Sequence, residues 1–279
     1  MSSDHLLRSH APITAEGWEG IDAEARERLV PSLGARRLVD FLGPHGWEHS
    51  ATNLGRVTAL DGAPEDGVGA SVRRVLPLVE IVIPFDLSRE ELRAGDRGAE
   101  DVDYDPLDEA ARRLARVENA AVFHGWKAAG ITGILEAATH DALEHQGGPE
   151  AFVGLVADGI EQLLRDGIDG PYGVALGEEM WSDVVEGSER GGYPVLRHLE
   201  QITEGPTVWT PGLRQAALVS LRGGDYLLDS GQDISIGYTS HDGAHVQLYL
   251  EETFSFRVAT PEAAIALTRP TARSRKARR

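Results

Sequence analysis

Residues 53–85 read NLGRVTALDGAPEDGVGASVRRVLPLVEIVIPF, a strand pattern that is interrupted by a turn and followed by a strongly apolar segment. The Asp-Gly pairs at 61–62 and 66–67 are turn signals, so a β-hairpin is predicted around them. Large apolar side chains are scarce before Val75. Because such a hairpin cannot bury a face of its own, we expect it to pack against another part of the structure, such as another chain. Residues 79–85 are almost continuously apolar, which predicts a buried strand.

Helical patterns flank this region on both sides. On the N-terminal side, Thr14 is the predicted N-cap and Pro31 the predicted end of a helix, whose apolar residues recur at helical spacing: Trp18, Ile21, Ala25 and Leu29. On the C-terminal side, Ser88 begins a capping-box sequence and a short helix. An Asp-Pro pair at 105–106 begins a longer predicted helix that ends near Gly125.

The second half of the chain has a different texture. Residues 131–215 alternate helical and short strand patterns, and residues 216–268 are mainly strand-like. The order is therefore a helix, a β-arm, further helix, an α/β region and a β region. This order predicts a mixed α+β protein with a protruding hairpin.

Residues 231–256, GQDISIGYTSHDGAHVQLYLEETFSF, gather polar side chains that suggest chemistry: Asp233, His241, Asp242, His245, Glu251 and Glu252. They fit two interpretations, a metal or acid–base site and the solvent-facing side of two β-strands. Apolar residues alternate with polar ones on both sides of a turn at 241–244, which is the period of a strand with one buried face. The alternation favours a structural hairpin, with both histidines at its end.

The composition narrows the class of protein. The chain has 279 residues, enough for a sizeable core, and its 41% hydrophobic and 26% charged residues are ordinary for a globular protein. There are no cysteines, which excludes disulfides, thiolate metal sites and a cysteine nucleophile. No apolar run approaches the ~18–20 residues of a membrane span, and the first residues lack the pattern of an export signal. We therefore expect a cytoplasmic protein.

The charge is distributed unevenly along the chain. The net charge of −18 argues against broad contact with nucleic acid, whose phosphates bind Lys and Arg. The last residues, 269–279, read RPTARSRKARR and contain basic residues but no acidic ones. This composition predicts a disordered basic tail, which serves either as a solubilising segment or as a contact with nucleic acid or an acidic partner.

The motif-like strings in the sequence do not match catalytic signatures. The string HDALEH at 140–145 has neither the H-E-x-x-H nor the H-x-x-E-H spacing of zinc proteases, so His140 and Glu144 are expected to form a surface pair on a helix. The string GVGASV at 67–72 lacks the third glycine of a dinucleotide-binding loop. The aromatic cluster FHGW at 123–126 fits a ligand pocket or, more typically, a helix end packed on the core. The sequence therefore predicts a protein that is not an enzyme.

Nine segments, taken in order and at their spacing, resemble the encapsulins, the linocin-like proteins of bacteria and archaea. The longest are PLVEIVIPFDLSREEL (77–92) and RGGDYLLDSGQDISIGYTSHD (222–242). The others are HAPITAEGW (10–18), ARRLVDFLGPHGWE (35–48), RGAEDVDYDP (97–106), VENAAVFHGW (117–126), DGIDGPYGVAL (166–176), GGYPVLRHL (191–199) and QLYLEETFSFRV (247–258). The resemblance covers residues 6–267. It is a resemblance to the family 1 type of encapsulin. It implies an α+β, tailed-bacteriophage major-capsid-like fold with a P-domain, an A-domain and an extended E-loop.

The resemblance also implies a division of the chain into regions. In order these are the N-terminal helix and arm of the P-domain (1–50), the E-loop hairpin (51–78), the P-domain with its long helix (79–131), the A-domain (132–215), the remaining strands of both domains (216–268) and the disordered basic tail (269–279). The tail extends beyond the usual family end, and we expect it on the outside of the particle.

The function implied by the resemblance is compartmentation. Encapsulin subunits self-assemble into a hollow icosahedral shell of sixty copies or a multiple. The shell encloses a cargo enzyme, commonly a dye-decolourising peroxidase or a ferritin-like protein, through the C-terminal targeting peptide of that cargo. Two alternatives are a viral or prophage capsid protein that packages DNA, which the acidic body disfavours, and an enzyme such as a secreted protease.

Site residues follow from the resemblance position by position. The cargo-peptide groove would be formed by Leu29, Arg36, Arg37, Leu38, Asp40, Asp233, Ile234 and Ile236. The loop around the five-fold pore would contain Gly187, Ser188, Glu189, Arg190, Gly191 and Gly192. Some family members bind a flavin against a tryptophan, but the equivalent position here is Glu90. We therefore expect no cofactor, no metal and no membrane partner.

Overall fold

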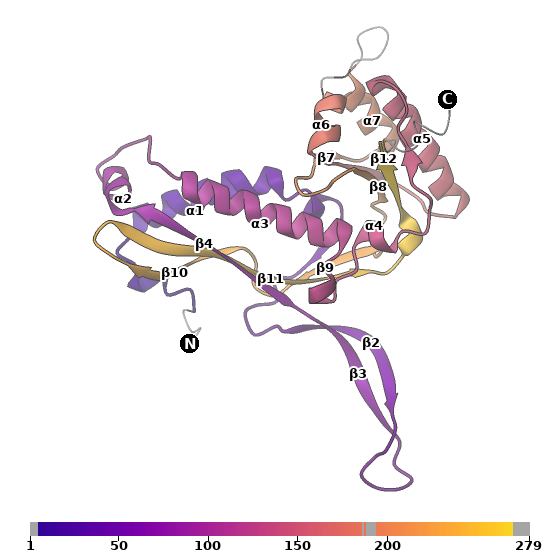
Figure 1. Cartoon of the computed structure of the whole chain (residues 1–279), viewed down its shortest axis with the longest axis horizontal. Coiled ribbons are helices and arrows are strands. Elements are labelled where there is room, and N and C mark those ends of the chain that lie inside the picture. The colour runs from indigo at the N-terminus through magenta and orange to yellow at the C-terminus, as the bar shows by residue number, and fades with distance from the viewer. Residues whose placement is uncertain (1–4, 186, 188–193, 270–279) are drawn as a thin grey trace, which may run out of the picture.

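The computed structural model describes residues 5–185, 187 and 194–269, and three parts are visible in it (Figure 1). An elongated body contains two long helices, α1 (Ala15–Ser32) and α3 (Asp105–His124), that lie along a sheet. A second body carries further helices and a sheet of its own, and a β-arm projects away from both. These three parts follow the predicted order of helix, arm, helix and mixed region.

The sheet of the elongated body is built on its longest strand, β11 (His245–Val258). Strand β4 (Val79–Ser88) pairs antiparallel with one edge of β11 over ten positions. Two strands follow one another along the other edge: β10 (Ser235–His241) and β9 (Tyr226–Ser230). The short strand β1 (Asp40–Leu42) pairs in parallel with β9 and forms an edge of the sheet.

The second body contains a sheet whose central strands are completely buried. All residues of β6 (Tyr172–Leu176) and β8 (Ala216–Ser220) are buried. The strand order is β5-β12-β8-β6-β7, with outer strands β5 (Leu143–Glu144), β12 (Ala264–Thr268) and β7 (Thr207–Trp209). The covering helices are α5 (Pro149–Arg165), α6 (Glu178–Val185) and α7 (Val195–Thr203). Burial of both faces explains the continuous apolar character of these strands.

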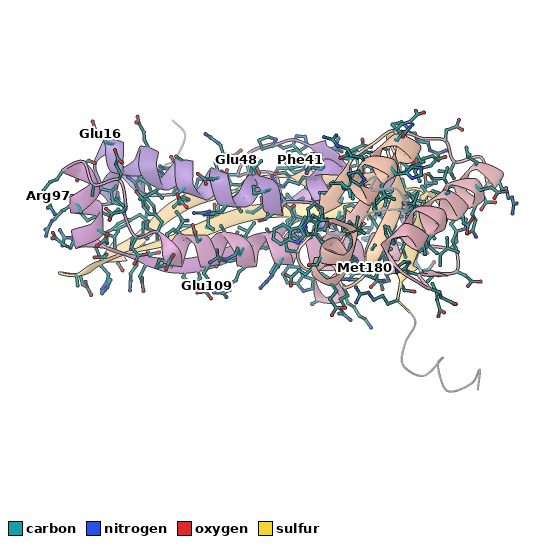
Figure 2. All side chains as sticks on the ribbon, turned by 90° about the horizontal axis from the view of Figure 1, so that it is seen from above. Glu16, Phe41, Glu48, Arg97, Glu109 and Met180 are labelled. Atoms are coloured by element: carbon teal, nitrogen blue, oxygen red, sulfur yellow. The ribbon has the colours of Figure 1, made fainter. Side chains whose placement is uncertain are left out.

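Helices α1 and α3 pack against each other and run side by side along the elongated body (Figure 2). The predicted caps are present, because the Thr14 hydroxyl accepts a hydrogen bond from the Gly17 amide at 2.9 Å and the Ser88 hydroxyl caps α2 (Arg89–Asp96). Two predicted boundaries differ by one residue: α1 runs through Pro31 to Ser32, and α3 begins at Asp105 with Tyr104 as its N-cap.

The short elements are α4 (Ile134–Ala137), η1 (Arg8–His10), η2 (Ala35–Arg37), η3 (Lys127–Ala129) and η4 (Pro261–Ala263).

The arm consists of β2 (Ala51–Leu60) and β3 (Ala70–Pro77), which pair antiparallel. Most of its side chains are exposed on both faces, including Val57, Val72 and Val75. The prediction of a hairpin that cannot bury its own face is confirmed. A two-stranded ribbon is marginal on its own in water, so its apolar residues favour contact with a partner.

Three local predictions are wrong. Residues 79–85 do not form a doubly buried strand, because β4 alternates buried and exposed residues and Val82 is 48% exposed. The reason is that β4 is an edge strand with α3 on one face only, and an edge strand also tolerates Pro84. Residues 140–145 are not helical, and Leu143 and Glu144 form β5 instead.

The third wrong prediction concerns the solvent-facing side of the second late strand. Alternation holds from Val246 to Leu250, but Glu251 and Glu252 are only 4% and 0% exposed. Consecutive strand residues face opposite sides of a sheet, so different elements bury them: Glu252 lies on the α3 side, where it shares Arg36 with Glu118, and Glu251 on the other side pairs with His5 of the N-terminal segment at 3.1 Å. Two acidic side chains are therefore buried in the body.

Candidate functional site

A groove of about 410 Å³ opens between α1, the segment before it and strand β10. The N-terminal segment contributes Leu6 and Arg8; α1 and the turn after it contribute Asp22, Ala25, Arg26, Leu29, Val30, Leu33 and Arg36; the late strands contribute Asp233, Ile234, Ser235, Ile236 and Leu250. Its walls are thus mostly apolar, with charged side chains at intervals. Such a surface fits an extended chain that offers apolar side chains and a few polar anchors.

Secondary structure explains how these residues meet. Asp22, Ala25, Arg26, Leu29 and Val30 follow the three- and four-residue spacing of one helix face. On the opposite wall, residues 234 and 236 alternate with 233 and 235 at the start of β10. The N-terminal segment is fixed to the same strand, because the Tyr238 amide donates to the Leu6 carbonyl at 2.8 Å.

The charges of the groove are only partly compensated. Arg8 pairs with Asp22 at 2.7 Å and lies over the Trp18 ring at 4.0 Å. Asp233 pairs with Arg36 at 2.7 Å. Arg26 is exposed, and none of the residues that the structure describes forms an ion pair with it. The groove therefore presents an uncompensated positive charge on a subunit whose net charge is −18.

A buried charge network lies beneath the groove. The Arg36 guanidinium donates to Glu118 Oε2 at 2.7 Å, to Asp233 Oδ1 at 2.7 Å and to Glu252 Oε1 at 2.5 Å. The side chains of Glu118 and Glu252 are 0% exposed. Such charge-assisted hydrogen bonds are short and strong. This network joins η2, α3 and β11 to Asp233, which precedes β10 on the opposite wall of the groove.

The network changes the acidity of its members. Burial, and then the negative charge of Glu118, raises the pKa of the Glu252 carboxyl well above its ordinary value. Burial acts to lower the pKa of Arg36, but the attraction of Glu118 and Glu252 outweighs it and raises that pKa. The guanidinium therefore stays charged, and the Glu252 carboxyl binds a proton more readily than an ordinary glutamate does.

Five of the eight residues predicted for cargo binding line this groove: Leu29, Arg36, Asp233, Ile234 and Ile236. The other three, Arg37, Leu38 and Asp40, border a separate hollow of about 170 Å³. Leu38 is only 1% exposed, and Asp40 accepts a hydrogen bond from the Gly224 amide at 2.5 Å. Leu38 thus packs in the core and Asp40 stabilises a turn, both away from the groove.

The remaining predicted positions are distributed over other surfaces. Of the predicted pore loop, Gly187 is described and buried, whereas residues 188–192 lie outside the described residues. Glu90 is exposed and pairs with Arg97 at 2.8 Å. The predicted hairpin end is confirmed, because β10 ends at His241 and β11 begins at His245.

Sequence reasoning missed several groove residues. Arg8, Asp22 and Arg26 were not predicted, although the last two share a helix face with Leu29. That face was visible as a spacing pattern. Glu118 gave no local signal, because only the packing of α3 against the body sheet brings it to Arg36.

Comparisons with known proteins identify the family. The model of the family described as Linocin_M18, encapsulating protein for peroxidase, matches residues 3–255. A type 1 encapsulin shell protein of Rhodospirillum rubrum is 46% identical over 94% of this chain and 95% of its own length. One from Mycolicibacterium paratuberculosis is 41% identical, covering 95% of this chain and 99% of the relative.

Solved structures agree on the fold. The virus-like particle protein of Pyrococcus furiosus superposes with a TM-score of 0.60 at 16% identity, over 90% of this chain and 99% of the other. A capsid structure of Mycobacterium phage Bobi gives a TM-score of 0.56 at 15% identity, over 86% and 91%. The predicted phage-capsid-like fold is confirmed.

The chain belongs to the encapsulin family and is of the type 1 shell-protein class. It is a subunit of a homo-oligomeric shell rather than an enzyme. Among the described residues, no helix combines the length and apolar character needed to cross a membrane.

We predict that Arg36→Met destabilises the subunit by about 3–5 kcal/mol, because it leaves Glu118 and Glu252 buried without their cation. Denaturant unfolding of the purified protein measures the loss. Arg37→Met is the matched control, since Arg37 is exposed beside it, and should have little effect. Adding Glu118→Gln and Glu252→Gln to Arg36→Met should restore much of the stability. Equal effects of the two arginine substitutions would contradict this account.

We also predict a specific pH dependence for Glu252. Because its pKa is raised in the folded state, the folded form holds this proton more tightly than the unfolded form. Its contribution to stability is fully present below the ordinary pKa of 4.5 and is lost as the pH rises toward the folded pKa, at up to about 1.4 kcal/mol per pH unit.

Glu252→Gln keeps the side chain neutral at every pH, so its stability relative to wild type should improve from pH 5 upward until the folded pKa of Glu252 is passed, and then stay level. Unfolding curves across this range, with the exposed residue Glu109→Gln as control, measure the difference. Parallel curves for wild type and Glu252→Gln would rule the prediction out.

Proposed function

We propose that this shell subunit forms a hollow icosahedral nanocompartment that encloses an enzyme cargo and that the α1–β10 groove binds the cargo's C-terminal peptide. The supporting observation is the groove itself, with apolar walls from two elements and an exposed Arg26 beside them. The family description names a peroxidase as the encapsulated protein. A dye-decolourising peroxidase or a ferritin-like protein is the cargo that we propose.

The groove's chemistry defines the peptide. An extended segment places alternate side chains on one side, and apolar side chains there would contact Leu29, Ile234 and Val30. A carboxylate of the peptide would meet Arg26, since Arg8 and Arg36 already have acidic partners. One such peptide binds weakly, but many identical sites in one shell raise the overall avidity.

Other regions take proposed roles from the same fold. The arm of β2 and β3 would be the E-loop that contacts a neighbouring subunit. The part of the second body that lies within residues 132–215 would be the A-domain at the symmetry axis, completed by strands β8 and β12 from the later region. The roles of the pore loop and of the basic tail stay predictions, because residues 188–192 and 270–279 lie outside the described residues. A cytoplasmic location is also our proposal, by family membership.

A viral capsid that packages DNA is the less favoured function. The phage capsid protein shares the fold at only 15% sequence identity. A likeness at this level is evidence for the fold and not for the function. The relatives at 46% and 41% identity are encapsulin shell proteins. Electron microscopy of the purified protein, combined with its ultraviolet spectrum, separates the two, because nucleic-acid absorbance in filled particles would favour the capsid.

We predict that Ile234→Asp removes cargo from the shell without preventing assembly. The substitution places a charge on the apolar wall, where Ile234 is only half-buried. The shell is co-expressed with a dye-decolourising peroxidase or ferritin-like protein from the same genome, and cargo per particle is measured by gel densitometry after size exclusion. We expect a loss of at least about tenfold, or ~1.4 kcal/mol of binding free energy.

Two controls isolate the groove. Leu164→Asp puts the same charge on an exposed apolar residue of α5 outside the groove and should retain cargo. Removing the cargo's C-terminal segment should abolish loading into wild-type shells. Hollow particles that keep their cargo after Ile234→Asp would leave the shell function standing and refute the groove assignment.

We further predict that low ionic strength weakens assembly. Each subunit carries −18, and repulsion between subunits reaches about 30 Å at 0.01 M salt but only about 8 Å at physiological salt. Light scattering should show a smaller shell fraction after dialysis into low salt, restored when salt is returned. An unchanged shell fraction would contradict the prediction.

A further inference from the structure

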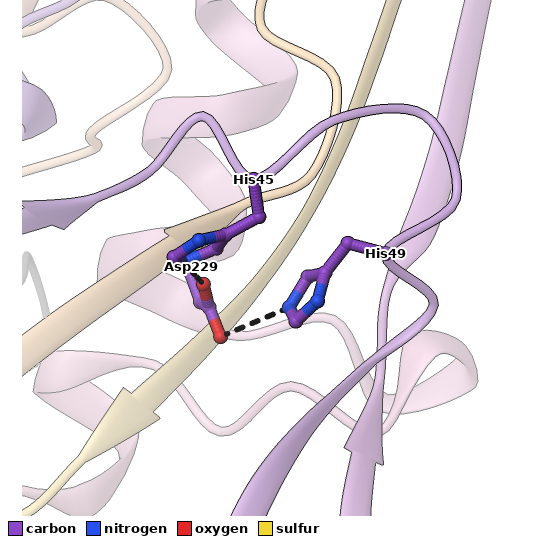
Figure 3. Close-up of side chains that lie close together, drawn as sticks. All are labelled: His45, His49 and Asp229. Carbon is purple, nitrogen blue, oxygen red and sulfur yellow. Dashed lines mark ion pairs between the residues drawn. The ribbon is translucent and has the colours of Figure 1, made fainter.

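Two histidines and an aspartate converge at the base of the arm (Figure 3). His45 and His49 lie in the loop between β1 and β2, and Asp229 lies on β9. Parallel pairing places Leu42 opposite Asp229, so the loop that follows β1 starts beside this carboxylate. The three side chains are therefore brought together by the sheet rather than by sequence spacing.

The ligand atoms of the three residues face one another. His45 Nε2 lies 2.9 Å from Asp229 Oδ1, and His49 Nε2 lies 3.6 Å from Asp229 Oδ2. One ligand atom from each residue fits within a 4.8 Å span, whereas ligands of a tetrahedral zinc ion are about 3.3 Å apart. Small rotations of the two histidines, which are 45% and 29% exposed, are enough to close this difference.

Two of these atoms lack the partner that a buried polar atom normally has. Asp229 Oδ1 and His49 Nε2 are both shielded from solvent, yet neither makes a hydrogen bond with any part of the chain that the structure describes. His45 is close to Oδ1 in distance but is not aligned as a hydrogen bond. Since buried polar atoms are rarely left unpaired, these two atoms favour a further partner, and a carboxylate facing two imidazoles is a donor set that suits a transition-metal cation.

The surroundings hold these side chains in place. The Asp229 side chain is more than nine-tenths buried, and its Oδ2 accepts a hydrogen bond from the Thr52 hydroxyl, which also contacts Ser255 Oγ at 2.6 Å. The loop is fixed to the strand by the His45 amide, which donates to the Ser230 carbonyl at 3.0 Å. Carboxylates of metal sites are typically oriented by such outer hydrogen bonds.

We propose that His45, His49 and Asp229 bind a divalent transition-metal ion, with Zn²⁺ the best match. Imidazole nitrogens favour zinc and similar ions over Mg²⁺ and Ca²⁺, which prefer oxygen ligands. Three protein ligands leave one tetrahedral position for water. The bound ion would tie the loop that enters the arm to the sheet of the body, and it would thus fix the arm's base.

Zinc titration of the tag-free, EDTA-treated and dialysed full-length shell tests this proposal. Isothermal calorimetry should give one site per subunit in wild type. Asp229→Asn and His49→Gln should weaken that site by about 100-fold or more, since even outer-shell changes cost about 10–100-fold. His10→Gln is the matched control, because His10 is exposed and lies outside the cluster. An affinity unchanged in both ligand variants, or no saturable site in wild type, would overturn the proposal.

X-ray absorption of the zinc-loaded wild-type shell provides a test that does not depend on how the variants fold. Two imidazole nitrogens and a carboxylate oxygen at about 2.0–2.1 Å are expected. A coordination sphere of oxygens alone, or one with a single imidazole, would refute the site. A wild-type protein shell that binds no zinc would likewise refute the proposal.

Discussion

A single buried guanidinium holds together the segments that build the groove. Arg36 bonds Glu118 from α3, Glu252 from β11 and Asp233 at the start of the groove's second wall. Removing two carboxylates from water is costly, and only a well-placed cation repays the cost. Together with Asn119, which accepts from the Ala35 amide and donates to the Ser32 carbonyl, Arg36 thus fixes the segment after α1 against α3 and the sheet.

Much of the fold was accessible from the sequence. Turn pairs and scarce apolar residues predicted the arm, and the hydroxyls of Thr14 and Ser88 correctly marked two helix starts. Period-two alternation predicted the hairpin of β10 and β11. Local patterns succeed here because each reflects contacts within one element or between neighbours. They failed at Glu251 and Glu252, because segments far away in sequence bury them: α3 packs on the side of Glu252, and the N-terminal segment covers Glu251 through His5.

The groove was predictable only in part, for the same reason. Leu29 and Ile234 came from a family resemblance, while a purely local argument would have offered the helix face of α1 without its partner strand. Arg37, Leu38 and Asp40 follow Arg36 directly, yet the turn of η2 directs them to another hollow. The cluster of His45, His49 and Asp229 left no pattern, because parallel pairing of β1 with β9 joins positions 180 or more residues apart.

The distribution of charge connects the groove to the shell. A subunit with a net charge of −18 should repel an acidic peptide, yet in the groove both aspartates are paired and Arg26 has no acidic partner among the described residues. Interactions between exposed charges fade within about 8 Å at physiological salt, so the peptide senses mainly these nearby groups. Arg26 is thus the groove's exposed cation without a described acidic partner, and it offers the nearest attraction to a peptide carboxylate in the binding that we propose. The acidic surface, in turn, bears on how subunits meet during assembly.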